Sequence, residues 1–98
     1  MEIKVNKICG FKSSVSGRGE KYSMTGNVNV DNGVMTNIES GIVKDDGGIQ
    51  VASFSYCGNL SIAYNTDDNT VMTAVITDIK SFVDYCKANT ASLNTVTA

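Results

Sequence analysis

The sequence contains no histidine, no proline and no tryptophan among its 98 residues. Histidine is the usual general base near neutral pH, the usual partner of a serine or cysteine nucleophile, and the commonest ligand of transition metals. Three scattered cysteines without histidine also make a poor tetrahedral zinc site. We therefore expect a protein that is not an enzyme and that holds no metal or cofactor.

Cysteine is scarce and odd in number: Cys9, Cys57 and Cys86 lie far apart, and no C-x-x-C spacing occurs. This usage is typical of an intracellular protein with reduced thiols. The sequence has no run of about 18 apolar residues, which a membrane-spanning helix would need. Its first residues show no basic-then-apolar signal pattern, so we expect a cytoplasmic protein with no membrane span.

Charge is unevenly distributed along the chain, although the formal net charge is only −2. Residues 1–30 carry five basic and two acidic side chains, which is 5 − 2 = +3. Residues 31–98 carry three basic and eight acidic side chains, which is 3 − 8 = −5. We expect the basic end and the acidic remainder to lie on different surfaces.

Residues 22–43 predict one β-hairpin, because apolar and polar side chains alternate around a turn signal at residues 31–33 (DNG). A two-residue turn would set Val28 opposite Asn37, which places an amide on the apolar face. A three-residue loop aligns the apolar sets, and a slip of one residue would turn every side chain over. We predict the three-residue loop, with Gly33 left-handed beside a bulge. The predicted pairs are Val30 with Val34, Val28 with Thr36, Gly26 with Ile38, and Tyr22 with Ile42.

Three further strands are expected outside this hairpin. Residues 2–9 alternate as the first strand, with a bulge near Asn6-Lys7, and residues 60–64 form a short last strand. Residues 49–56 (IQVASFSY) are apolar on both faces, as in a central strand or a strand at a subunit contact. Residues 10–20 (GFKSSVSGRGE) lack periodicity and predict a long, mobile surface loop.

A helix is predicted over residues 69–88, where apolar side chains recur at three- and four-residue steps. Asp67, Asp68 or Asn69 would cap its start, while Asp78 and other charged residues fall mostly off the apolar stripe. The expected fold is α+β: a five-stranded antiparallel meander sheet with one C-terminal helix packed on it. Residues 1–89 form a single domain, and residues 90–98 form a flexible tail.

The span from Val30 to Ser55 resembles the SpoVG family. Val30-Asp31-Asn32, Ile38, Ile42 and the run DGGIQVA at residues 46–52 follow that family's hairpin, Ile-rich strand, polar glycine turn and Val-Ala run. Ser53 and Phe54 stand where SpoVG proteins have a proline. The resemblance implies a small non-enzymatic dimer that contacts nucleic acid. The order of strands then helix is also similar to that of Whirly-type single-strand-binding dimers.

The candidate nucleic-acid contacts are basic residues of the first strand and the 10–20 loop, with serine hydroxyls donating hydrogen bonds to phosphate. These are Lys4, Lys7, Lys12, Arg18 and Lys21. A second group of residues, Phe54, Tyr56 and Tyr64, could stack on unpaired bases or pack in the core or in a homodimer interface. We assign no catalytic residue and no metal ligand.

The alternative is a protein–protein interaction or assembly module with no nucleic-acid role. Its motivation is the acidic sequence pI of about 4.8 and the two-faced strand at residues 49–56. In that case a charge at Phe54 would break an oligomer.

Overall fold

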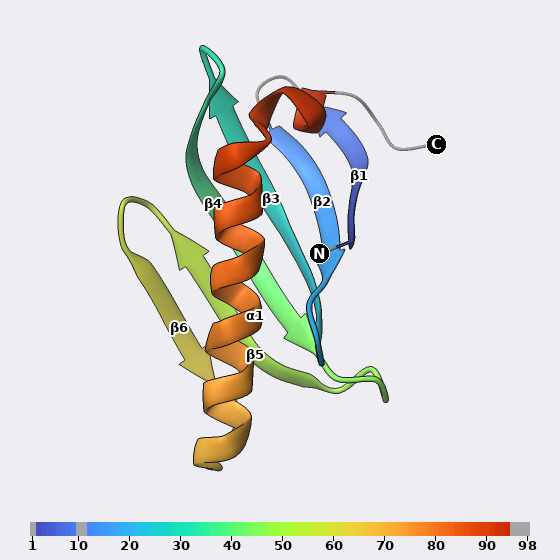
Figure 1. The fold of residues 1–98 in the computed structure, drawn as a ribbon, viewed down its shortest axis with the longest axis vertical. Coiled ribbons are helices and arrows are strands. Elements are labelled where there is room, and N and C mark those ends of the chain that lie inside the picture. The colour runs from blue at the N-terminus through green and yellow to red at the C-terminus, as the bar shows by residue number, and fades with distance from the viewer. Residues whose placement is uncertain (1, 10–11, 95–98) are drawn as a thin grey trace.

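A computed structural model describes residues 2–9 and 12–94 of the chain. Six strands form one antiparallel sheet in sequential order, and a single α-helix crosses one face of it (Figure 1). The predicted α+β meander with a C-terminal helix is confirmed, with six strands in place of five. The elements are β1 (Glu2–Cys9), β2 (Lys12–Arg18), β3 (Ser23–Asp31), β4 (Val34–Lys44), β5 (Gln50–Tyr56), β6 (Leu60–Tyr64), α1 (Asn69–Ala88) and the 3-10 helix η1 (Thr90–Asn94).

The additional strand is β2, which lies where we expected a mobile loop. Residues 12–18 pair with β1 on one side and with β3 on the other. Ser13, Val15 and Gly17 face the helix, and Val15 is fully buried. A Cβ on Gly17 would lie 2.5 Å from the Ile3 side chain and 3.0 Å from Phe82, so the strand needs a small residue there. The loop prediction was therefore wrong for these residues, while residues 10 and 11 lie outside the described part of the chain.

The turn between β3 and β4 has two residues, Asn32 and Gly33, with φ angles of 53° and 77°. Gly33 is left-handed as predicted, but the three-residue loop is wrong. A two-residue turn with positive φ at both positions has the twist that a hairpin favours. The pairs beside the turn are Asp31 with Val34 and Val30 with Met35.

Two bulges in β4 then restore the alignment of apolar residues. Beyond Thr36, Val28 pairs with Ile38, and beyond Ser40-Gly41, Met24 pairs with Val43. Ser40 has a φ of 55°, and a Cβ on Gly41 would lie 2.6 Å from the Phe54 ring. Each bulge slides β4 by one residue, so that buried residues again oppose buried residues. Strand β4 can therefore follow the favoured two-residue turn and still set its buried apolar residues opposite those of β3.

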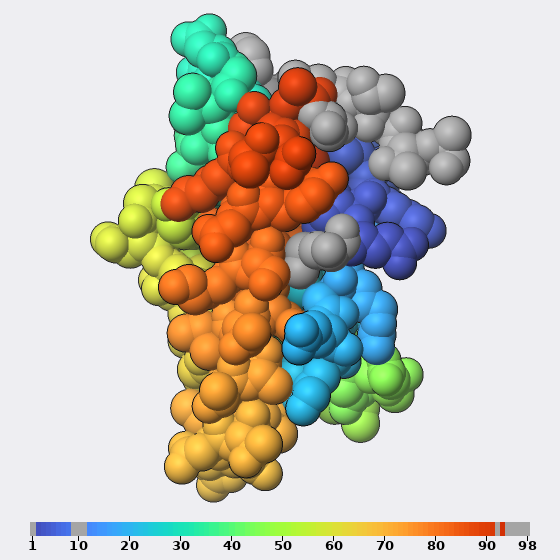
Figure 2. Space-filling model, viewed as in Figure 1, coloured from blue at the N-terminus to red at the C-terminus, as the bar shows by residue number. Residues whose placement is uncertain are grey.

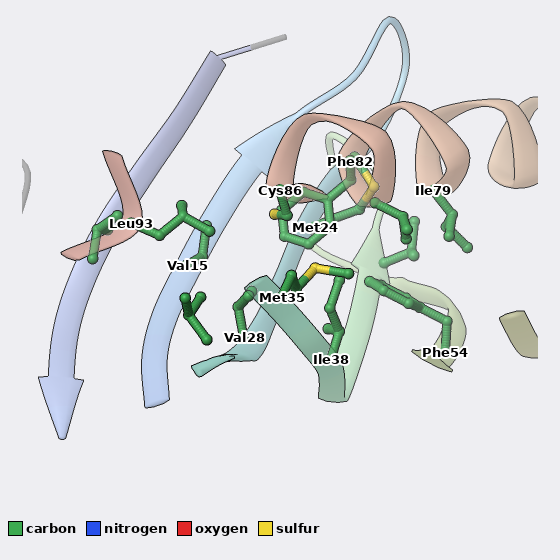
Figure 3. Packing of buried hydrophobic residues seen from close by; sticks show 14 of the residues in the cluster. Val15, Met24, Val28, Met35, Ile38, Phe54, Ile79, Phe82, Cys86 and Leu93 are labelled. Atoms are coloured by element: carbon green, nitrogen blue, oxygen red, sulfur yellow. The ribbon is translucent and has the colours of Figure 1, made fainter. Parts of the chain in front are cut away.

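The core lies between α1 and the sheet (Figure 3). The predicted capping cluster supplies Asp68, whose carboxylate accepts from the Thr70 and Val71 amides. Phe82 meets Phe54 edge to face, with ring centroids 6.0 Å apart. The buried apolar residues of α1 all belong to the predicted stripe: Val75, Ile79, Phe82, Val83 and Cys86.

Residues 90–94, which we expected to be loose, form η1 and close one end of the core. Leu93 is fully buried, and the Ser13 hydroxyl donates a hydrogen bond of 2.8 Å to its carbonyl oxygen. The Thr90 hydroxyl donates to the Gly33 carbonyl oxygen at 2.7 Å. The tail prediction therefore needs correction for these residues, whereas residues 95–98 lie outside the described part.

Asp78, expected to lie off the apolar stripe, is buried with 3% of its surface exposed. Its carboxylate accepts hydrogen bonds of 3.0 Å from the backbone amides of Glu20, Lys21 and Tyr22. Gly19 leaves room for it, because a Cβ there would lie 2.3 Å from the Asp78 carboxyl carbon. One helix side chain thus holds the whole β2–β3 turn.

Replacing Asp78 by alanine should lower the free energy of unfolding by about 3–5 kcal/mol. Each hydrogen bond to a charged acceptor contributes about 1.5–3 kcal/mol, and three partly buried backbone amides would lose their partner. Asp84→Ala is the matched control, since Asp84 is exposed on the same helix and surface changes usually stay within about 0.5 kcal/mol. Urea unfolding would measure both; equal stabilities of the two variants would contradict the anchoring role.

Cys86 makes the stability of the fold sensitive to alkaline pH. Burial raises the pKa of its thiol from 9.0 to about 12, because the charged thiolate is poorly solvated in the core. The unfolded thiol ionises above pH 9 while the folded thiol stays neutral. The stability from this group is therefore complete below pH 9 and is lost as pH rises toward 12.

The Cys86→Ala variant should show a flatter decline of unfolding free energy above pH 9 than the parent protein, although it is less stable at pH 7. All other titrating groups are shared, so the difference in slope isolates this thiol. Denaturant unfolding at a series of pH values gives the two slopes. Parallel curves would show that Cys86 does not carry the effect.

Candidate nucleic-acid interface

The sheet face opposite α1, here called the open face, is lined by small polar side chains. The register of the strands shows which residues lie on this face, since Ser14, Ser16 and Thr25 alternate with residues that face the core. Across β2 to β4 the uncharged polar residues on this face include Ser14, Ser16, Ser23, Thr25, Asn27, Asn29 and Asn37, and the acidic residues Asp31 and Glu39 lie on the same face. Side chains of this kind offer hydroxyl and amide hydrogen-bond donors to a ligand.

The basic residues of β1 reach this face because of a bulge at Asn6. Lys4 pairs with Ser16 and Lys7 pairs with Ser14, so both lysines lie on the open face. An uninterrupted strand would place residues 4 and 7 on opposite faces. The predicted bulge near Asn6-Lys7 is confirmed, and it also turns Ile8 toward the core side.

Lys12 and Arg18, at the two ends of β2, lie on the same face. Lys7 and Lys12 border a hollow of about 230 Å³ together with Ser14 and Asn27. Lys4 and Arg18 border another of about 220 Å³, lined further by Glu2, Ser16, Gly17, Ser23, Met24 and Thr25. Two shallow hollows therefore each combine two cations with hydroxyl or amide groups.

Acidic side chains partly neutralise these cations. Lys12 Nζ lies 3.0 Å from Glu39 Oε2, and Arg18 Nη1 lies 2.8 Å from Asp46 Oδ1. The four side chains are between 42% and 76% solvent-exposed, and exposed ion pairs contribute only about 0–1 kcal/mol. An incoming anion can therefore replace either carboxylate at small cost.

Lys21 lies apart from the other predicted contacts. It belongs to the β2–β3 turn that Asp78 holds, and it borders a hollow beside the first half of α1. Lys44 takes its place on the open face, because it is exposed and pairs with Ser23 next to Arg18. Our sequence reasoning missed Lys44 because it counted that residue with the acidic remainder. Its position depends on the bulge at Ser40, which turns Val43 to the core and Lys44 to the open face, and our predicted hairpin did not include that bulge.

The aromatic candidates do not join the basic residues. Phe54 is buried at 4% exposure against Phe82, which agrees with core packing among the three alternatives and leaves its ring inaccessible to a base. Tyr56 and Tyr64 are half-buried on the helix side of β5 and β6. Lys87 Nζ lies 4.7 Å from the centroid of the Tyr56 ring, and Tyr56 raises the pKa of this lysine.

Comparison of the chain with protein-family models, with curated proteins and with solved structures finds no match. Among the described residues, α1 and the other helical segment are too short or too polar to cross a bilayer. Over the same residues, no three histidine, cysteine or acidic side chains gather as metal ligands would.

Proposed function

We propose that this chain is a small, non-enzymatic, dimeric nucleic-acid-binding module of SpoVG-like type. The open face at β1 and β2 would contact the phosphate backbone. The observation that carries the proposal is the bulge at Asn6, which turns Lys4 and Lys7 to the face that already holds Lys12 and Arg18. Serine and asparagine side chains lie between these cations, as they do in many phosphate-binding surfaces.

The chemistry favours contact with the backbone over base reading. The aromatic side chains of β5 and β6 face the helix side, which leaves no aromatic stacking platform among the described residues of the open face. Cations and hydroxyls that meet phosphates fix position but carry little sequence information. We therefore expect weak sequence preference and affinity that falls steeply with salt.

The number of cations sets the size of this effect. Four phosphate contacts would give a slope of log affinity against log salt of about −3 for a single strand, at about −0.7 for each contact. The overall charge of −2 repels a polyanion from the other surfaces of the protein, so it favours binding through the open face.

The decisive variant replaces Lys4, Lys7 and Lys12 together by alanine. It should weaken binding of a labelled single-stranded oligonucleotide at low salt by about tenfold or more and reduce the salt slope by about 2. Fluorescence anisotropy at several salt concentrations measures both quantities.

The matched control replaces Lys21, Lys80 and Lys87, which removes the same charge away from the open face. Its affinity should stay within about threefold of the parent. Equal losses in the two variants would mean that net charge alone governs binding. Unchanged affinity in the Lys4, Lys7 and Lys12 variant would remove the proposed role of this face.

A protein-assembly role is the second candidate. It can no longer rest on Phe54, which is buried inside one copy, and a charge there would unfold the domain. The observation that favours assembly lies instead at the outer edge of β6.

A further inference from the structure

The outer edge of β6 presents backbone groups in a regular row. The Asn65 amide donates to the Val51 carbonyl oxygen at 2.8 Å, so residues 61, 63 and 65 direct their backbone groups toward β5. In an antiparallel pair the backbone N–H and C=O groups of the alternate residues then point away from the partner strand. These are Leu60, Ile62 and Tyr64, and no strand of the described residues pairs with β6 on that side.

The side chains of the same three residues form an apolar strip beside the helix. They lie on the helix side of the sheet and are half-buried. The helix packs over β2 to β5, and Figure 2 shows the yellow-green atoms of the β5–β6 region extending past its flank. A neighbouring strand at this edge would therefore cover apolar surface as well as pair with the backbone.

The two edges of the sheet differ in how they are protected. Strand β1 carries Glu2, Lys4 and Lys7 and a bulge, which are devices that prevent edge-to-edge pairing. Strand β6 carries no charge and no proline, and its pairing with β5 has no register shift. The unprotected edge is the one that suits a permanent partner.

The sequence of β6, Leu-Ser-Ile-Ala-Tyr, is complementary to itself. In an antiparallel pair centred on Ile62, Ile62 meets its own copy and Leu60 meets Tyr64 of the second copy. Ser61 then meets Ala63. The three residues whose backbone groups point outward therefore pair with one another. Apolar side chains lie opposite apolar side chains on the helix side of the sheet. Small side chains lie opposite small side chains on the open face. No like charges are brought opposite each other.

We propose that β6 joins two copies of this chain by antiparallel pairing about Ile62. The two sheets of six strands would become one continuous sheet, with the two-fold axis perpendicular to the sheet and midway between the two Ile62 residues. Both helices then lie on the same side, and each basic β1–β2 region lies at an outer end. Such an isologous contact is the usual form of a homodimer, and it does not depend on nucleic-acid binding.

Disulfide trapping tests both the contact and its register. Hydrogen-bonded antiparallel pairs have Cα atoms about 5.5 Å apart, which lies within the usual range for a disulfide. In a background with Cys9→Ser and Cys57→Ser, Ile62→Cys should form a cross-linked dimer under mild oxidation. Ser61→Cys should cross-link far less, because its partner position is Ala63. Equal cross-linking of the two variants, or none in Ile62→Cys, would overturn the proposed register.

Solution mass tests the dimer without cysteine chemistry. Sedimentation of the parent protein should give twice 10.4 kDa. Ile62→Lys should give a folded species of half that mass, since two ammonium groups would meet at the axis, and circular dichroism checks that it folds. Ser55→Lys, an exposed change on neighbouring β5, should remain dimeric. A monomeric parent at the protein concentration of the trapping experiment, or an Ile62→Lys dimer, would refute the proposal.

Discussion

The packing of α1 on the sheet depends on the hydrogen bonds of the buried Asp78 carboxylate. This carboxylate accepts hydrogen bonds from three backbone amides of the β2–β3 turn and so fixes α1 to the sheet at the start of β3. A buried charge is tolerable only where hydrogen bonds replace its water, and Gly19 leaves the space that this requires. With α1 held on one face, the alternate residues of the strands beneath it must be apolar or small, and most polar side chains are left on the open face.

Bulges decide which side chains reach each face. In β4, the residues Thr36 and Ser40 absorb the mismatch between a two-residue turn and the apolar pattern. In β1, the bulge at Asn6 gathers Lys4 and Lys7 on one side. The same device therefore serves packing in one strand and a candidate ligand surface in the other. A regular sheet of this sequence would scatter its cations over both faces.

Much of the fold follows from hydrophobic periodicity, and the failures have definite causes. The helix over residues 69–88 and the strand over residues 60–64 were predicted with their observed bounds, because their apolar patterns are strong. Strand β2 was missed because its core-facing positions are mostly serine and glycine, which carry no hydrophobic signal. The hairpin register failed because a sequence pattern cannot distinguish one shifted strand from one with two bulges. Asp78 was misplaced because its burial depends on a turn far away in the chain.

Amide chemical-shift mapping would locate the contact between the open face and a polyanion residue by residue. On addition of a single-stranded oligonucleotide to the uniformly labelled protein, we expect shifts at Ser14, Ser16 and Asn27 and in the side-chain amides of the open face. Residues of α1 between 75 and 86 should stay unchanged. Shifts confined to the helix side, or no shifts at low salt, would show that the open face does not bind the oligonucleotide.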